Sequence, residues 1–374
     1  IDLSELEIGW KKLLTNQFHD ILPGSCVREA VIDAYNYYQE AEKIAEQIVA
    51  NSYDYLIRHS NSKDDNSDVF VFNPFSYSRE DLIILDMEQF EENKKKFNAL
   101  TGTDGEIIKL QKTKNKYFFK DLIPAMGYKK YKLINVEYKD KKTVQSKDFR
   151  LENEYISLSI NQNGNLCSIY DKRSRREIIK GEEANLFELF KEKPCYYDAW
   201  DINISESDKV IINNVQEISY KEQGPVYDSI LIRKKHNNTI IEQEIRLSKK
   251  SSRIDFKTKI DWQERQKLLK ASFPVNLNNP KANYEIAFGN LERPTTSNTS
   301  WEQAQFEVYA HKWADLSEYN YGVSLLNDCK YGYDIKDNVM RITLLKGGLY
   351  PDPDVDLGEH QFTYSLYSHN GVLR

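Results

Sequence analysis

The stretch NQFHDILPGS at residues 16–25 places a histidine and an aspartate side by side between two helical patterns. A neutral imidazole is a good ligand for a divalent metal ion. The turn formers Pro23, Gly24 and Ser25 already supply what a connection between helices requires. The alternative is structural, because His19 could bond a carbonyl at the end of a helix and Asp20 could cap the turn before the proline.

Two later stretches carry residue types that suit ligand binding. KPCYYDAWDIN at 193–203 combines aromatic rings with carboxylates, including Trp200 and Asp201, and this mixture suits sugar rings. The alternative is an aromatic loop buried between sheets. LYPDPDVDLGEHQ at 349–361 has alternating acids, including Asp352 and Asp354, which could bind calcium, hydroxyl groups or nothing. It lacks the glycine placement and length of an EF-hand loop, so a solvated loop is the alternative here.

Complete catalytic or metal motifs are absent from the sequence. The other histidines are scattered, the four cysteines are far apart, and neither H-E-x-x-H nor C-x-x-C occurs. There is no G-x-S-x-G and no glycine loop for phosphate. A net charge of −6 argues against a nucleic-acid partner, and no apolar run reaches the roughly 18 residues of a membrane helix. We therefore expect no nucleic-acid partner and no membrane partner. We also expect no complete catalytic apparatus in these residues.

Apolar spacing predicts two helices at the start of the chain. Residues 3–14 repeat apolar side chains at helical intervals, and residues 27–57 alternate steps of four and three, as in the seam of a helical bundle. Ser25 is the expected N-cap of the second helix. One short neighbour cannot cover a helix of about 45 Å, so we expect a third helix or another domain upstream of Ile1.

Beyond these helices the apolar period changes to two, which predicts β-strands. Polar linkers are expected at 60–68 and 138–148, on either side of a small β unit. Many short strands then follow to the end, including a hairpin with its turn at Asn237-Asn238. We predict an α+β multidomain chain with a helical-bundle domain at 1–60, a small β domain at 68–140 and a large antiparallel β-sandwich at 147–374.

Several of these stretches together resemble family 38 glycoside hydrolases, the α-mannosidases, and most closely their bacterial, vacuolar and cytosolic branch. The resemblance covers nearly the whole chain in the family's order. It rests on NQFHDILPGS, YDAWDI, ERPTTSNTSW, AHKWADLSE, YGVSLLNDCKYGYD and YPDPDVDLGEHQFTYSLY.

The resemblance implies a retaining hydrolase of α-mannosides that uses one zinc or another divalent ion, such as cobalt. It implies that His19 is one metal ligand and that Asp20 contacts sugar hydroxyls, with Asp352 and Asp354 as further substrate contacts. Trp200 and Asp201 of the aromatic loop join them as substrate-binding candidates. The family has an N-terminal catalytic domain, a three-helix bundle and C-terminal β domains that include a very large sandwich, a supersandwich.

The N-terminal catalytic domain, with the nucleophile and the acid/base, has no counterpart in these residues. We therefore expect the middle and C-terminal part of an enzyme that is inactive by itself. Its partners would be the missing domain and a mannose-containing oligosaccharide, in a bacterial cytoplasm, and a homo-oligomer is left open.

Two other classes of function stay open at this stage. A stand-alone carbohydrate-binding β-sandwich would use the loop around Trp200, and its helices would have no exposed apolar seam. A structural or assembly role would instead make the large sandwich a surface for association between copies.

Overall fold

The computed structural model describes residues 3–59, 68–86, 97–114, 116–137 and 148–371. These residues fall into two compact units. The first comprises residues 1–140 with segments 196–201 and 349–355, and the second comprises 141–195, 202–348 and 356–374. Apart from Asp68 and Asp148, the predicted linkers at 60–68 and 138–148 lie outside the described residues.

The first unit begins with two helices, α1 (Leu3–Thr15) and α2 (Arg28–Arg58). They approach each other closely at Gly9, where an added Cβ atom would lie 3.5 Å from Ile44 Cγ2. At the turn between them, the Asn16 side chain donates a hydrogen bond of 2.8 Å to the carbonyl oxygen of Ala34. The two predicted helices are confirmed, and none of the described helices is long and apolar enough to span a membrane.

The expected N-cap at Ser25 is wrong. Val27 holds the N-cap position of α2 with an extended backbone and makes no side-chain cap. Ser25 is buried and donates its hydroxyl hydrogen bond to Asp20 Oδ1 instead, at 3.2 Å. The serine therefore stabilises the loop rather than the helix.

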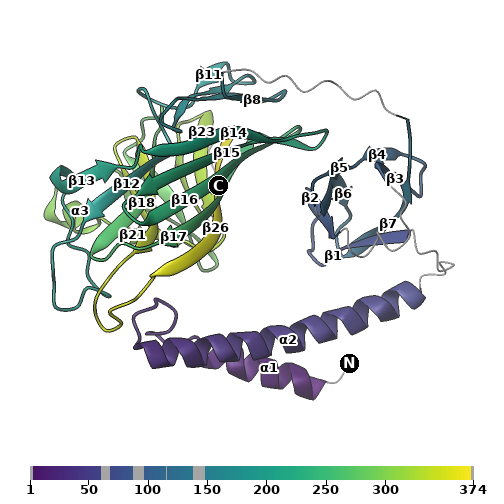
Figure 1. The fold of residues 1–374 in the computed structure, drawn as a ribbon, viewed down its shortest axis with the longest axis horizontal. Coiled ribbons are helices and arrows are strands. Elements are labelled where there is room, and N and C mark those ends of the chain that lie inside the picture. The colour runs from purple at the N-terminus through teal and green to yellow at the C-terminus, as the bar shows by residue number, and fades with distance from the viewer. Residues whose placement is uncertain (1–2, 60–67, 87–96, 115, 138–147, 372–374) are drawn as a thin grey trace. The chain divides into compact units, whose positions relative to one another are not determined.

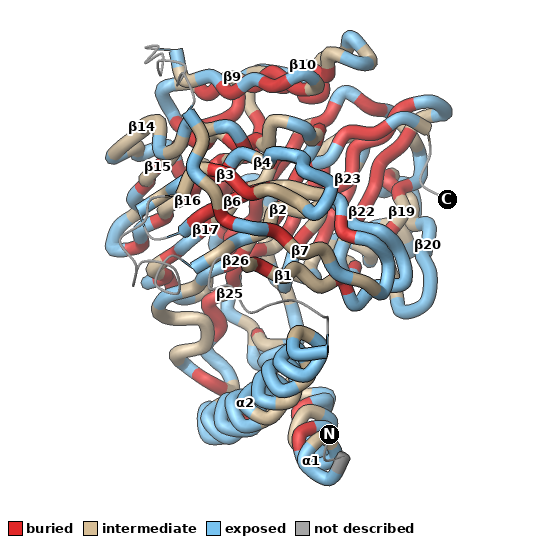
Figure 2. Tube along the Cα trace, turned by 90° about the vertical axis from the view of Figure 1, so that its right-hand side faces the viewer, coloured by how far each residue is buried: buried red, intermediate tan, exposed pale blue. Residues whose placement is uncertain are grey.

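Most residues of the two helices are exposed (Figure 2). Among the described residues of α2, only Ala34 is buried. Large apolar side chains on α1, on α2 and in the loop between them remain open to solvent: Ile8, Trp10, Leu14, Phe18, Leu22, Val27, Ile32, Tyr35, Val49 and Leu56. Within the described residues, the pair thus lacks the partner that its apolar pattern requires.

The rest of the first unit's main segment forms two small antiparallel sheets with a shared core. Phe119 on one sheet meets Tyr131 on the other edge-to-face, with ring centroids 5.3 Å apart. The first sheet has the order β1 (Asp68–Asn73), β7 (Gly127–Ile134), β3 (Ala99–Gly102), β4 (Ile107–Lys109). The second has the order β2 (Arg79–Asp86), β6 (Lys116–Ile123), β5 (Gln111–Lys112).

The second unit consists of three antiparallel sheets (Figure 1). The largest has the order β14 (Val215–Gln223), β15 (Tyr227–His236), β16 (Thr239–Ser248), β17 (Arg253–Trp262), β26 (Gly358–Asn370), β23 (Tyr321–Asn327), β22 (Trp313–Ser317), β19 (Lys281–Ile286), β20 (Gly289–Pro294). The next has the order β13 (Lys209–Ile211), β12 (Leu186–Lys191), β18 (Lys267–Pro274), β25 (Val339–Lys346), β24 (Gly332–Lys336), β21 (Val308–Tyr309). The smallest has the order β11 (Arg176–Glu177), β10 (Leu166–Asp171), β9 (Ile156–Ile160), β8 (Arg150–Glu152). The short helices η3 (Glu206–Asp208) and α3 (Ser300–Ala304) lie in connections.

The two larger sheets of the second unit share one core. Phe256 and Tyr364 of the largest sheet stack at 5.0 Å, and Phe273 of the six-stranded sheet lies 5.5 Å from Phe256. The hairpin expected between β15 and β16 is confirmed, with Asn237 at a positive φ of 48° in its turn. The prediction of mostly antiparallel β structure with few helices is likewise confirmed.

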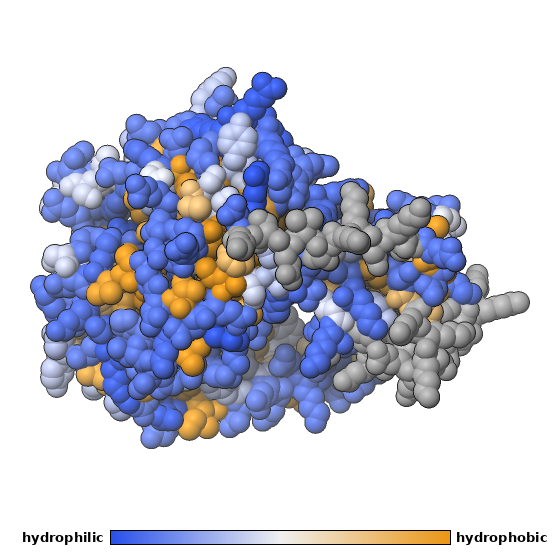
Figure 3. Space-filling model, turned by 45° about the horizontal axis from the view of Figure 1, so that its top comes forward, coloured by the Kyte–Doolittle hydropathy of each residue, from blue (hydrophilic) through white to orange (hydrophobic). Residues whose placement is uncertain are grey.

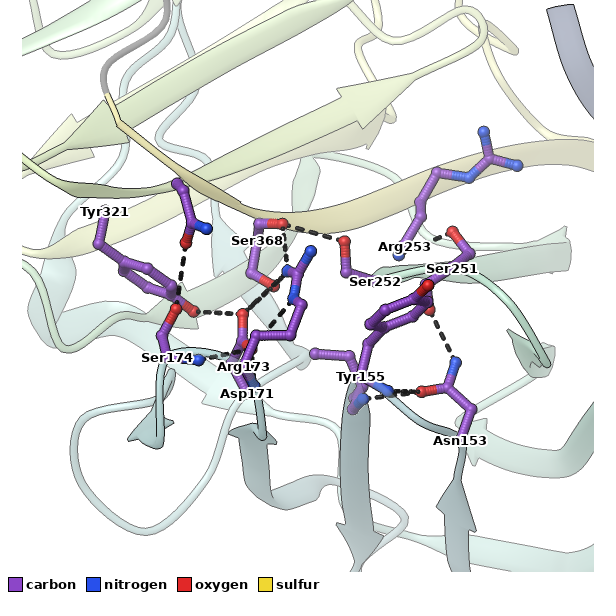
Figure 4. Close-up of polar contacts among 12 residues, drawn as sticks. Asn153, Tyr155, Asp171, Arg173, Ser174, Ser251, Ser252, Arg253, Tyr321 and Ser368 are labelled. Carbon is purple, nitrogen blue, oxygen red and sulfur yellow. Dashed lines mark hydrogen bonds and ion pairs between the residues drawn. The ribbon is translucent and has the colours of Figure 1, made fainter.

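The buried carboxylate of Asp171 ties the smallest sheet of this unit to the largest (Figure 4). It accepts hydrogen bonds from Arg173 at 3.0 Å, Ser368 at 2.9 Å and Tyr321 at 3.2 Å. Burial opposes its ionisation, but the hydrogen bonds from Arg173 and Ser368 outweigh it and hold the pKa of Asp171 below the ordinary value of 3.8. The charged form therefore stabilises the end of β26.

Replacing Asp171 by Asn should lower the free energy of unfolding at pH 7 by about 2 to 3 kcal/mol, because charge-assisted hydrogen bonds are lost. Since the folded pKa is lowered, this contribution is complete above the ordinary pKa and disappears as the pH falls through the folded value. Urea unfolding should thus show the difference between wild type and Asp171→Asn shrinking below about pH 4.

The matched control is Glu292→Gln, which removes a carboxylate from the exposed pair with Lys281. It should change the free energy of unfolding by less than about 1 kcal/mol. A difference for Asp171→Asn that is the same at pH 7 and at pH 3 would contradict the role of its charge.

Candidate functional site

Three chain segments that carry the candidate residues belong to the first unit. They are the loop 16–27 between α1 and α2, the segment 196–201 and the segment 349–355. The last two are separated from the helices by most of the chain, yet their contacts are with this unit. Residues from all three segments therefore can serve one site.

The loop 16–27 is a series of tight turns held by its own backbone. The amide of Ile21 donates to the carbonyl of Phe18 at 2.9 Å, and the amide of Ser25 donates to the carbonyl of Asp20 at 3.0 Å. Gly24 has a φ of +72°, a conformation that favours glycine. This backbone fixes where His19 and Asp20 leave the loop.

His19 and Asp20 form a pair in which the histidine is exposed and the aspartate is half-buried. The His19 side chain is 78% exposed, and its Nε2 atom lies 3.6 Å from Asp20 Oδ2. The imidazole also rests on the ring of Phe18, with centroids 4.3 Å apart. Among the residues that the structure describes, no carbonyl accepts a hydrogen bond from His19, whereas Asp20 braces the turn through Ser25. An exposed imidazole at a fixed position can be one ligand of a metal ion whose other ligands lie on a partner surface.

Asp352 of the third segment lies near the loop 16–27. Its negative charge and that of Asp20 both act on the thiol of Cys26. Burial raises the pKa of the Cys26 thiol, and the negative charges of Asp20 and Asp352 raise it further. Asp352 itself is buried, and its Oδ1 accepts a hydrogen bond of 2.9 Å from the amide of Asp354. Two of the acids nominated from different stretches thus share one environment.

Arg28 at the start of α2 binds Asp354. The distance from Arg28 Nη1 to Asp354 Oδ2 is 2.9 Å, across 326 residues of sequence. Both side chains are substantially exposed, so the pair adds at most about 1 kcal/mol to stability. Its main effect is to orient the carboxylate of Asp354.

Asp198 connects the second and third segments. It is 5% exposed, and its two carboxylate oxygens accept hydrogen bonds from the backbone amides of Leu349 at 2.6 Å and Tyr350 at 2.9 Å. Charge-assisted bonds to backbone amides are among the stronger hydrogen bonds in proteins. Asp198 is therefore a structural clamp rather than an exposed acid.

The Asp198 clamp gathers four aromatic rings, Tyr196, Tyr197, Trp200 and Tyr350, into what we call the aromatic platform. Tyr350 lies 5.9 Å from Tyr197 and 6.3 Å from Trp200, measured between ring centroids. All four side chains are exposed, with Tyr196 at 79%. The alternative that this loop is buried between sheets is therefore wrong.

All residues that the sequence nominated lie in the first unit: His19, Asp20, Trp200, Asp201, Asp352 and Asp354. It did not predict the structural roles of four further residues, because these roles depend on contacts between remote segments. These are Cys26, Arg28, Asp198 and Tyr350. Asp198 carried the only local signal, as an acid among exposed aromatics, and its burial was not foreseeable.

The described residues supply only part of the coordination shell of a metal ion. Among the residues that the structure describes, no group of three or more His, Cys, Asp or Glu side chains could hold an ion. The exposed His19 fits one ligand position of zinc, which needs about four. The described residues thus fit a contributor to a metal site and not a whole one.

Comparisons with known proteins identify the family. The family model for the glycosyl hydrolases family 38 C-terminal domain matches residues 151–354, and the model for the alpha mannosidase middle domain matches residues 1–56. The chain belongs to glycosyl hydrolase family 38.

Its similarity to individual members covers nearly the whole chain. It is 31% identical to alpha-mannosidase G of Dictyostelium discoideum over 98% of this chain and 36% of that protein. It is 30% identical to alpha-mannosidase 2C1 of Mus musculus over 99% of this chain and 34% of that protein. The crystal structure of an alpha-mannosidase from Enterococcus faecalis V583 has the same fold, with a TM-score of 0.80 at 18% identity, over 99% of this chain and 51% of that one. The chain thus spans about a third of the length of these curated relatives.

Removing the clamp by Asp198→Ala should release the third segment, because Leu349 and Tyr350 lose their acceptors. Hydrogen exchange followed by mass spectrometry should show these two amides exchanging at least about tenfold faster, as expected for charge-assisted bonds.

Asp208→Ala is the control, since Asp208 is exposed on η3 in the other unit. It should leave the exchange of residues 349–350 unchanged. Equal exchange in wild type and Asp198→Ala would show that another contact holds the segment.

Proposed function

We propose that this chain is the middle and C-terminal part of a retaining, metal-dependent α-mannosidase that acts on mannose-containing oligosaccharides. The observation that carries the proposal is the convergence of three remote segments on the His19–Asp20 pair and an aromatic platform. The relatives compared above are named alpha-mannosidases, which supports the substrate class.

In this proposal His19 is one ligand of a divalent ion, zinc or another such as cobalt. The support is its exposure and its position on a fixed loop. The other ligands would come from a part of the protein beyond these residues. A bound ion would polarise and hold hydroxyl groups of the sugar.

The substrate contacts in this proposal are Asp20, Trp200, Asp201, Asp352 and Asp354. Carboxylate oxygens accept hydrogen bonds from sugar hydroxyls, and an exposed indole offers an apolar face to the C–H side of a sugar ring. Asp352 is largely buried and spends Oδ1 on the backbone, so it would reach a sugar through Oδ2.

The nucleophile and the acid/base are proposed to lie in a catalytic domain outside this chain. Retention requires two carboxylates about 5 to 5.5 Å apart on either side of the scissile bond. In this proposal the acids Asp20, Asp201, Asp352 and Asp354 contact substrate and Asp198 is a structural clamp, so none of these acids belongs to that pair. The catalytic domain would also cover the apolar surface of α1 and α2.

Further architectural and cellular features remain proposals. They are a three-helix bundle that includes α1 and α2, a supersandwich for the large sheets, and domain boundaries at 1–60, 68–140 and 147–374. A bacterial cytoplasmic location, a homo-oligomer and the absence of nucleic-acid or membrane partners also belong here.

A non-catalytic carbohydrate-binding protein is the second candidate, and the exposed aromatic platform favours it. That class requires helices without an exposed apolar seam, however, and exposed apolar side chains are frequent on both helices. An assembly role would draw on the apolar residues that gather among hydrophilic ones on the face drawn in Figure 3. Neither alternative accounts for the His19–Asp20 pair.

The chain of residues 1–374 alone should not hydrolyse an aryl α-mannoside at an enzyme-like rate, because it would lack the nucleophile and three metal ligands. Release of the chromogenic aryl group by the purified chain measures this directly. Turnover at about 1 per second or faster, an ordinary rate for an enzyme, would overturn the proposed division of the site.

In the complete enzyme, His19→Ala should reduce both bound zinc and α-mannosidase activity, the latter by more than about 100-fold. Loss of groups that merely support a ligand already costs 10- to 100-fold, so loss of a ligand should cost at least as much. Metal content by mass spectrometry and aryl α-mannosidase assays are the measurements.

The matched control is His59→Ala at the end of α2, where the imidazole bonds the carbonyl of Tyr55. This variant should retain its metal and its rate. If His19→Ala also retains both, His19 is a surface residue of the loop and the proposed ligand role is wrong.

A further inference from the structure

One edge of the nine-stranded sheet in the second unit is regular and open. This edge is β20, which pairs with β19 over all of its residues, Gly289–Pro294, without a bulge. Four of its six residues are exposed (Figure 2). The opposite edge of the same sheet, β14, has two register shifts along β15, and bulges of this kind hinder pairing with another chain. We propose that β20 pairs with β20 of a second copy of this protein and extends the sheet across a twofold axis.

The register along β19 decides which backbone groups of β20 face the open edge. A turn of two residues joins the strands, so Ile286 and Gly289, which flank it, form a hydrogen-bonded pair. Such pairs alternate along an antiparallel ladder. The N–H and C=O groups of Asn290 and Glu292 therefore point away from β19. Among the described strands β20 neighbours β19 alone, so these edge groups are open to a further strand.

A twofold arrangement allows three registers for these edge groups, and one of them fits. Pairing Glu292 with itself opposes two like charges and requires an N–H group from Pro294, which has none. Pairing Asn290 with itself leaves Glu292 opposite the turn of the second copy. Pairing Asn290 with Glu292 of the second copy uses the edge N–H and C=O groups of both residues. The charges and the backbone thus select this third register.

The side chains of the selected register complement one another. The Asn290 amide lies opposite the carboxylate of Glu292 in the second copy and can donate to it. The Glu292 carboxylate binds Lys281 through Oε2 and is 56% exposed, so its Oε1 atom can accept from that amide. Leu291, which is 46% exposed, meets Leu291 of the second copy at the axis. The pairing therefore buries apolar surface and opposes no like charges.

Phe288 at the tip of the hairpin supplies an independent observation. It is fully exposed and has a φ of +65°, a conformation that a bulky residue rarely adopts. Backbone strain of this kind persists where the surrounding structure or a function requires it. In the selected register Phe288 lies next to Pro294 of the second copy, and this contact removes the aromatic ring from water.

A cysteine substitution tests the register in the complete protein that contains this chain. Leu291→Cys should give a disulfide-linked dimer under mild oxidation. Opposite residues of a non-hydrogen-bonded pair lie close enough for this bond. The control is Tyr319→Cys, at an exposed position between β22 and β23, which should give no linked peptide of residue 319. Nonreducing electrophoresis and mass spectrometry of the linked peptides are the measurements.

Charge substitutions test the same pairing without a cysteine. Asn290→Lys places two lysines opposite two Glu292 carboxylates and should tighten the dimer roughly threefold to tenfold. Adding Glu292→Lys to this variant opposes lysines across the axis and should weaken the dimer below wild type. The control Asn320→Lys adds the same charge between β22 and β23 and should leave the dissociation constant unchanged. Sedimentation velocity over a concentration series measures these constants.

Three outcomes would each overturn the proposal. They are a monomer at every concentration, a dimer without the crosslink between the two copies of residue 291, and equal constants for Asn290→Lys and Asn320→Lys. A monomer in which the amides of Asn290 and Glu292 resist hydrogen exchange would assign the edge to another part of the same protein. The inference rests on the homo-oligomer proposed above, and none of these outcomes depends on α-mannosidase activity.

Discussion

The hydrogen bonds from the amides of Leu349 and Tyr350 to Asp198 are the contact on which the rest of the site depends. They join two loops about 150 residues apart and bring Tyr350 against Trp200. The same third segment then carries Asp354 to Arg28 on α2. One buried carboxylate thereby converts three separate stretches of chain into a single surface.

Two independent features of the first unit support the proposal that this surface is shared with another domain. The helices expose apolar side chains that helices of a finished domain would bury, and His19 offers one ligand where a structural or catalytic zinc needs about four. Both deficits concern the same unit, and a single additional domain would remove both. The length of the relatives, about three times that of this chain, is consistent with such a domain.

Local sequence patterns predicted the helices and the hairpin between β15 and β16, because each depends on neighbours a few residues away. The assignment of Ser25 as an N-cap failed because its hydroxyl has a competing acceptor in Asp20. The Arg28–Asp354 pair and the burial of Asp198 were beyond prediction. Their partners are chosen by the folded backbone, and no spacing along the chain encodes them.

The most direct test of this account is a crystal structure of the complete enzyme with data collected on both sides of the zinc absorption edge. The account predicts an anomalous peak about 2.0 to 2.1 Å from a ring nitrogen of His19, with the remaining ligands supplied by a domain packed on α1 and α2. A zinc peak held entirely by other residues, with His19 facing solvent, would contradict it.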